Sequence, residues 1–284
     1  MRITPHQQKQ TRLKTLLKGV SAAAQVIDRK FREAFGDPRF IKSGPRQGGY
    51  SPVSPYRVAL ITLTYERDGM WEPRHIAALL DHYRKWFKRN AKGQAVPECH
   101  YVWVMELTEI GRPHYHIVMW MPRGVTPPFP DDQGWWPHGM SNAKFATSPV
   151  GYIVKYASKL ETKSGRHLPP GARLWGYGGL KMAERASVAF ANSPRWLKGL
   201  IHHESFPRKR KVEVNVEKEI KGQRFQFKAV ITAWLLTAGI SAGYAFVGPY
   251  EVDGFASDGL VLRHRGHVDV YTPCGGFFAI PHEG

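Results

Sequence analysis

Residues 101–121 read YVWVMELTEIGRPHYHIVMWM, and this stretch decides the fold that the sequence predicts. Its two ends, Tyr101–Leu107 and His114–Met121, have the alternation and the length of strands, and a short polar connection, Thr108–Pro113, joins them. Two strands that are separated by so short a loop pair as an antiparallel hairpin. We therefore expect a hairpin here, with the rest of the domain built around it.

The segments on either side of the hairpin predict an α+β domain. Arg57–Tyr65 is rich in β-branched residues and has the length of a strand. Pro73 begins an amphipathic helix whose apolar side chains recur at helical spacing. Ser148 and Pro149 start a second helix, which runs to about Leu160. Strand, helix, hairpin, loop and helix in this order predict an antiparallel sheet with helices on one face.

Composition divides the chain into three parts. Residues 1–55 form a basic helical region, Pro5–Phe35, followed by a linker that is rich in glycine and proline. Residues 56–205 form the main domain. Residues 206–284 form a C-terminal region to which the sequence assigns no role.

The charge of the chain limits its partners. The 284 residues include 41 Lys and Arg against 23 Asp and Glu, which gives a net charge of +18 at neutral pH. A folded protein with such an excess repels itself and gains from contact with phosphate, so we expect a polyanionic partner, first of all a nucleic acid. An anionic membrane surface is the alternative, and charge alone does not separate the two.

One apolar stretch bears on the membrane alternative. Ala229–Val247 contains nineteen residues without a charge, which is the length of a membrane span. It has only two leucines and several small or hydroxyl-bearing residues, so we expect a buried helix or a strand pair there. The two cysteines, Cys99 and Cys274, lie far apart, and the first ten residues lack the features of a signal peptide. These features favour a reducing compartment, the cytoplasm.

Two features of the hairpin indicate a metal site. His114 and His116 stand at i and i+2 on one strand, so their imidazoles point to the same face. Glu106 precedes His114 by eight residues and falls opposite it across the turn, while Glu109 in the turn is the competing carboxylate. Two neutral imidazoles and a carboxylate suit a divalent catalytic metal. The plain alternative is a set of polar residues on the solvated face of a sheet.

A third feature is a helix that carries tyrosines and lysines along one face. Tyr152, Lys155, Tyr156 and Lys159 stand at i, i+3, i+4 and i+7. A phenol is a poor nucleophile at neutral pH, so it needs cations that favour phenolate and a metal that polarises the phosphate. Its attack on a DNA phosphodiester would leave a 5′-phosphotyrosine and a free 3′-OH. An amphipathic surface helix is the alternative explanation.

The order of these motifs resembles a known superfamily. The strand ALITLTY, Glu106 ahead of PHYH, and the helix YIVKYASK resemble the three motifs of the HUH endonucleases. The chain is most similar to the two-tyrosine rolling-circle replication initiators of small single-stranded DNA phages, the gene A and filamentous phage types. The resemblance covers about residues 56–160. It implies a five-stranded antiparallel sheet with both histidines on the central strand and the tyrosine helix across it.

The resemblance also implies roles for individual residues. Three side chains would hold Mg²⁺ or Mn²⁺: His114, His116 and Glu106. Four side chains would be catalytic, two as nucleophiles and two as positioning or charge-stabilising groups: Tyr152 and Tyr156, then Lys155 and Lys159. Thr62 and Thr64 lie in the first motif, whose role is less defined. The implied partners are single-stranded and origin DNA, a helicase and a DNA polymerase of a bacterial host, and no small-molecule substrate.

Two other functions are compatible with the same residues. A relaxase or a single-strand transposase of the same superfamily uses the same chemistry, and it differs in whether a double-stranded origin is nicked and unit-length circles are released. A noncatalytic basic DNA-binding or packaging protein, attached to a membrane through Ala229–Val247, is the alternative from another class. Formation of a covalent tyrosyl adduct discriminates the enzyme from this noncatalytic alternative.

Overall fold

The computed structural model divides the chain into two compact units, residues 1–184 and 185–284. The three-part division expected from composition stays a prediction. The structure describes the following residues: 5–158, 169–199, 201, 207–220, 223–238, 241–246, 250–256, 259–264, 267–272 and 276–281.

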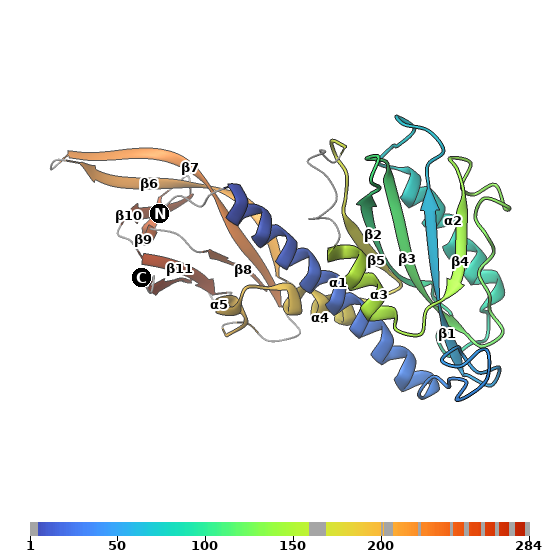
Figure 1. Cartoon of the computed structure of the whole chain (residues 1–284). Helices are drawn as coiled ribbons and strands as arrows, with labels where there is room; N and C mark the ends of the chain where they lie inside the picture. Colours follow the sequence, from blue (N-terminus) through green and yellow to red (C-terminus); the bar gives the residue numbers. More distant parts are fainter. Residues whose placement is uncertain are drawn as a thin grey trace. The chain divides into compact units, whose positions relative to one another are not determined.

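The first unit is built on a five-stranded antiparallel sheet in the order β4-β1-β3-β2-β5 (Figure 1). The bounds of the strands are β1 Tyr56–Thr64, β2 His100–Leu107, β3 Pro113–Pro122, β4 Ser141–Phe145 and β5 Trp175–Gly178. The predicted hairpin is β2 and β3, and β3 is the central strand. The α+β fold class is confirmed.

Helices cover both faces of this sheet, so the expectation of helices on one face is wrong. The helices of the chain are α1 Pro5–Phe35, α2 His75–Asn90, α3 Pro149–Ser158, α4 Met182–Asn192 and α5 Arg195–Lys198. The apolar stripe of α2 packs in one core cluster with the side chains that β1, β2 and β3 present on the same face, such as Leu63, Met105 and Tyr115. The side chains that alternate with these point to the other face, and α1 and α3 lie there.

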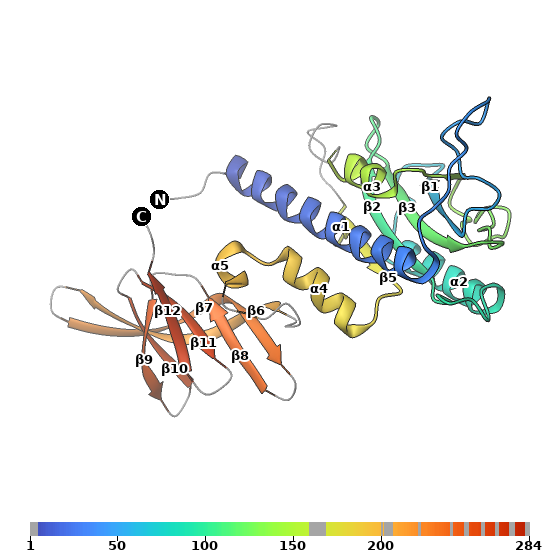
Figure 2. The ribbon, with the colours of Figure 1, turned by 90° about the horizontal axis from the view of Figure 1, so that it is seen from below.

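Helix α1 covers the far end of this second face. Phe31 is fully buried, and its ring packs edge-on against Tyr56 and His100, with centroids 5.5 Å away in both cases. The indole Nε1 of Trp120 on β3 donates to Asp28 Oδ1 of α1 at 3.2 Å. Figure 2 shows α1 running beside α3, which α1 contacts. Helix α3 covers the other end of this face, where β3 begins.

The second unit contains a seven-stranded sheet in the order β12-β11-β8-β7-β6-β10-β9. Its strands are β6 Arg208–Ile220, β7 Gln223–Ala238, β8 Ser241–Phe246, β9 Tyr250–Ala256, β10 Gly259–His264, β11 His267–Thr272 and β12 Gly276–Pro281. The described residues of Ala229–Val247 therefore form an antiparallel strand pair, β7 with β8. Across the described ranges, no helix has the length and apolar character of a membrane span.

Candidate active site

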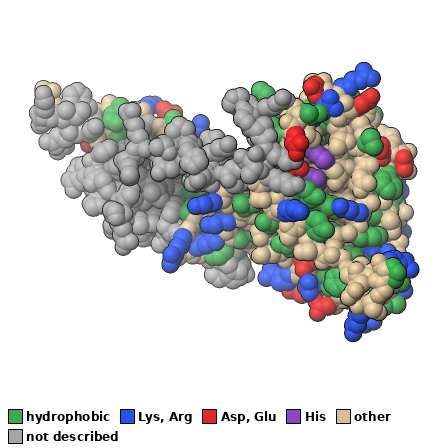
Figure 3. Space-filling model, viewed as in Figure 1, with side chains coloured by type: hydrophobic (Ala, Val, Ile, Leu, Met, Phe, Trp, Pro, Cys, Tyr) green, Lys and Arg blue, Asp and Glu red, His purple; other side chains and the backbone are tan. Residues whose placement is uncertain are grey.

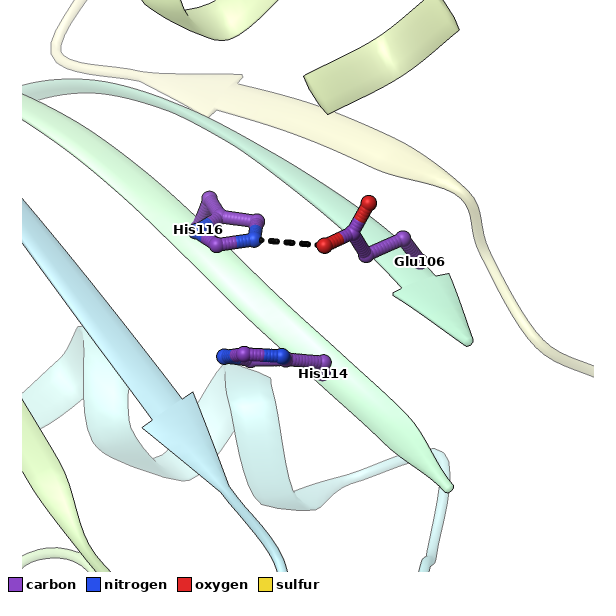
Figure 4. Close-up of side chains that lie close together, drawn as sticks. All are labelled: Glu106, His114 and His116. Atoms are coloured by element: carbon purple, nitrogen blue, oxygen red, sulfur yellow. Dashed lines mark hydrogen bonds and ion pairs between the residues drawn. The ribbon is translucent and has the colours of Figure 1, made fainter. Parts of the chain in front are cut away.

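Three polar side chains meet on the face that α1 and α3 cover. His114 and His116 project from β3, and Glu106 projects from the neighbouring strand β2, where it pairs with His114 in the register (Figure 4). One ligand atom from each residue lies within 4.8 Å of the others. Nε2 of His116 and Oε1 of Glu106 are 3.0 Å apart. The structure thus brings together the three residues that the sequence singled out, which we call the triad.

Two of the three triad side chains are buried, and this affects the charge that the site can accommodate. Glu106 is 5% exposed and His116 is 3% exposed, while His114 is half-buried. Figure 3 shows histidine side chains reaching the surface with acidic side chains beside them. A buried carboxylate needs a neighbouring positive charge or strong donors, and a divalent cation supplies such a charge. Two imidazole nitrogens and one carboxylate oxygen fit a divalent ion. Glu109 is exposed in the turn, outside this group.

A hydroxyl on the next strand orients one of the imidazoles. Thr62 of β1 pairs with His116 in the register, and its Oγ1 lies 3.3 Å from His116 Nδ1. This contact leaves Nε2 of the same ring facing Glu106. Hydrogen bonds to the far nitrogen of a ligating histidine fix its tautomer and its direction. The sequence placed Thr62 in a motif without a defined role, and the geometry makes it a positioning residue for His116.

Removal of this hydroxyl should weaken metal binding without unfolding the sheet. We expect Thr62→Val to lower the affinity for Mn²⁺ by about tenfold, because loss of such outer partners costs about 10–100-fold in metal affinity. Calorimetric titration of the DNA-free protein measures it. Thr64→Val is the matched control, because the Thr64 hydroxyl donates to the Met140 carbonyl, 3.0 Å away. Equal affinities for Thr62→Val and wild type would contradict the role of Thr62.

Helix α3 carries both tyrosines on the face of the sheet that bears the triad. It begins directly after Ser148, whose carbonyl accepts the backbone N–H of Tyr152 at 2.9 Å. Ile153 and Ala157 are fully buried and fix the side of the helix that packs inward. Side chains three and four residues apart share a helix face, so the two tyrosines stand next to this buried stripe.

Tyr156 lies directly on the triad. Its ring stacks on the imidazole of His116, with centroids 3.5 Å apart and planes inclined by 14°. Burial raises the pKa of the Tyr156 phenol above its ordinary value, and the Glu106 carboxylate and Tyr152 add to the rise. A metal ion at the triad would act in the opposite direction, because a nearby cation favours the phenolate.

The two lysines of the helix motif are placed less closely. Lys155 is exposed on α3, and Lys159 lies outside the described residues. The contribution of α1 was not predicted from the sequence: this helix packs against α3, which carries the tyrosines. The fully buried stripe of α1, with Val20, Ala24 and Ile27 at helical spacing, was the available signal.

A protein-family model matches the part of the chain that carries this site. Residues 58–161 match a family model described as replication-associated protein ORF2. The match spans just over a third of the 284 residues and includes the triad and both tyrosines. Neither the curated proteins nor the solved structures contain a significant match to the chain. The matched part of the chain is similar to replication-associated proteins, which supports the role of a DNA-binding replication initiator.

Proposed function

We propose that this protein nicks and rejoins DNA by metal-dependent tyrosine transesterification, and so starts rolling-circle replication of a small phage or plasmid genome. One observation carries the proposal: the ring of Tyr156 lies face to face with His116 of the triad. A tyrosine nucleophile needs a phenol that is held beside the group that activates its target. The match of residues 58–161 to a replication-associated family supports the same function.

The triad would hold one divalent ion, Mg²⁺ or Mn²⁺. Imidazole ligands favour Mn²⁺ over the harder Mg²⁺. When bound, the ion would polarise an oxygen of the scissile phosphate and offset its negative charge. Thr62 would keep His116 turned toward the ion, because it lies against the other ring nitrogen.

The tyrosines would carry the covalent step. The phenol oxygen forms a bond to phosphorus while the bond between phosphorus and O3′ breaks. The phenol gives up its proton, and the departing 3′ oxygen takes one up. Lys155, and Lys159 beyond the described residues, would stabilise the negative charge that develops on the phosphate. One phosphodiester replaces another, so attack by a 3′-OH on the phosphotyrosine rejoins the strand.

The products of this step define the partners in the proposal. A free 3′-OH is the primer that a DNA polymerase extends, and a helicase separates the strands ahead of it. We therefore place the protein with these two enzymes of a bacterial host, in the cytoplasm. No small-molecule substrate is required, because the tyrosyl linkage retains the energy of the phosphodiester.

The test is a covalent adduct with single-stranded DNA. A 5′-phosphotyrosine retains the part of the strand 3′ to the nick, so a 3′-labelled strand transfers its label to the protein. A library of randomised strands supplies the target sequence. We expect a labelled protein band that survives denaturing electrophoresis, depends on Mn²⁺ or Mg²⁺ and disappears with EDTA.

The polarity of the label is the control. The same library with a 5′ label should leave the protein unlabelled, because that part of the strand departs with the 3′-OH. A wild-type protein that gains no label with either metal would contradict the proposal, and label transfer from the 5′ end alone would overturn the direction of attack.

A further inference from the structure

A pocket of about 250 Å³ lies at the end of the sheet where β1 ends and the β2–β3 turn lies. One wall comes from the segment after β1, and the other comes from the turn. The side chains that matter for its chemistry are Tyr65, Arg67, Trp71, Ile110 and Arg112. The sequence predicted no functional role for any of them, and none belongs to the triad or to α3.

Hydrogen bonds and an ion pair connect the two walls of the pocket. Arg112 Nε donates to Asp68 Oδ1 at 2.5 Å, and its Nη1 donates to the Glu66 carbonyl at 2.8 Å. The indole N–H of Trp71 donates to the Tyr115 hydroxyl at 2.8 Å, which ties the pocket to the buried core. These bonds hold a guanidinium and an indole at fixed places, so the pocket is built before any ligand arrives.

The pocket lies at the same end of the sheet as the triad. Pro113 lines it, and the next residue of β3 is the triad histidine His114. Successive side chains of a strand point to opposite faces, and Tyr65 and Trp71 pack with the core cluster on the α2 side, so the triad lies on the other side of this end. A DNA strand that is held at the triad and passes around the end of the sheet can reach the pocket.

The lining suits an unpaired base better than a phosphate alone. Trp71 and Ile110 offer apolar surface, and two arginines, Arg67 and Arg112, offer planar cationic groups. Unpaired bases bind proteins by stacking on aromatic rings and guanidinium planes, with basic side chains along the backbone. A site for phosphate alone would need donors and would gain nothing from Trp71 and Ile110.

We propose that this pocket receives one unpaired base of the substrate strand, in the part of the strand that passes this end of the sheet. The proposal rests on the proposed nicking function. It gives the protein a contact with a base of the strand, in addition to the contacts of its basic side chains with the DNA backbone.

Binding to a strand with and without bases tests the pocket apart from nicking. The probes are a fluorescein-labelled single strand of randomised sequence and an abasic strand of the same length, and anisotropy is measured in EDTA at one salt concentration. We expect Trp71→Ala to weaken binding of the base-bearing strand by at least about fivefold and to leave the abasic strand within about twofold of wild type. An unchanged affinity, or an equal loss for both strands, would overturn the proposal.

A second pair of variants avoids the core. Ile110 and Val53 are exposed branched apolar residues, at 54% and 51%, and Val53 is remote from the pocket in the sequence and does not line it. We expect Ile110→Glu to weaken binding of the base-bearing strand by at least about fivefold more than Val53→Glu does, because only the first places a carboxylate at the pocket. Equal effects of the two substitutions would refute the pocket as a binding site.

The two hypotheses fail in different ways. If Trp71→Ala binds the base-bearing strand as tightly as the wild type while the wild-type protein forms the tyrosyl adduct, the pocket is refuted and the nicking function is kept. A protein that binds bases through Trp71 but forms no adduct would refute the nicking function and keep the base site.

Discussion

A protein that carries both Tyr152→Phe and Tyr156→Phe is expected to form no covalent adduct with DNA. Phenylalanine keeps the ring that packs against His116 and removes only the oxygen that would attack phosphorus. Binding of DNA should stay within about twofold of wild type, because no charge that contacts phosphate is lost. Denaturing electrophoresis measures the adduct, and anisotropy measures binding. An adduct that persists in this double variant would contradict the tyrosine mechanism.

The single variants separate the two phenols. Tyr156 stacks on His116, whereas Tyr152 stands one turn earlier on α3. We expect Tyr156→Phe to slow the first nick by more than about a thousandfold, which is the scale of losing a nucleophile, and Tyr152→Phe to slow it less. Both should stop repeated release of circles, because the second phenol must attack the next junction.

A control removes a phenol elsewhere on the same sheet. Tyr177 lies on β5, where it pairs with Val102. Tyr177→Phe should nick and release circles as the wild type does. Undiminished circle output from both helix variants would contradict alternating use of the two tyrosines.

His116→Ala is expected to remove metal binding and nicking together. The substitution deletes one of the three ligand atoms and the surface on which Tyr156 stacks. We expect more than about a tenfold loss of affinity for Mn²⁺ in the DNA-free protein, and more than about a hundredfold loss of adduct formation. Calorimetry and denaturing electrophoresis measure the two effects independently.

His82→Ala is the matched control for this variant. His82 is exposed on α2 and stacks on Trp135, with centroids 5.5 Å apart, so it lies with the helix on the opposite face of the sheet. It should bind metal and nick as the wild type does. If His116→Ala retained wild-type affinity for Mn²⁺, the triad would not be the metal site.

The part of the site that the sequence predicted is the part that depends on local spacing. The two-residue period of a strand puts His114 and His116 on one face without any knowledge of the fold. The eight-residue separation across a tight turn predicted that Glu106 lies opposite His114, and the register of β2 and β3 has this pairing. The stack of Tyr156 on His116 depends on where α3 packs on the sheet. The spacing of residues within one segment does not determine this position.

Strand β5 shows why other elements were not predicted. Its sequence, WGYG, contains two glycines, which disfavour a strand by propensity. In the structure, a Cβ at Gly176 would lie 2.6 Å from Nε1 of Trp103, and a Cβ at Gly178 would overlap the ring of Tyr101. The glycines are needed because aromatic rings of β2 lie across β5. This reason is a tertiary contact, and the sequence of the strand alone does not reveal it.

The faces of the sheet were mispredicted for a related cause. A helix that precedes a glycine- and proline-rich linker gives no sign of which surface it covers. The contacts of Phe31 show which face α1 covers, because its ring lies against Tyr56 and His100 on the face that carries the triad. The position of α1 depends on residues that come much later in the chain, as the hydrogen bond between Trp120 and Asp28 shows, since these residues are 92 positions apart.

The place of α1 in the fold has a consequence for synthesis on the ribosome. Helix α1 is made before the surfaces that bury its apolar stripe, which belong to β2, β3, α3 and β5. Those surfaces exist only after β5, at Trp175–Gly178, has emerged. During translation, the apolar side chains of α1 therefore stay exposed to water or bound to a chaperone until those segments are made. Contacts between segments that are distant in the sequence also form slowly. Helix α1 therefore reaches its full set of contacts only after β5 has been made.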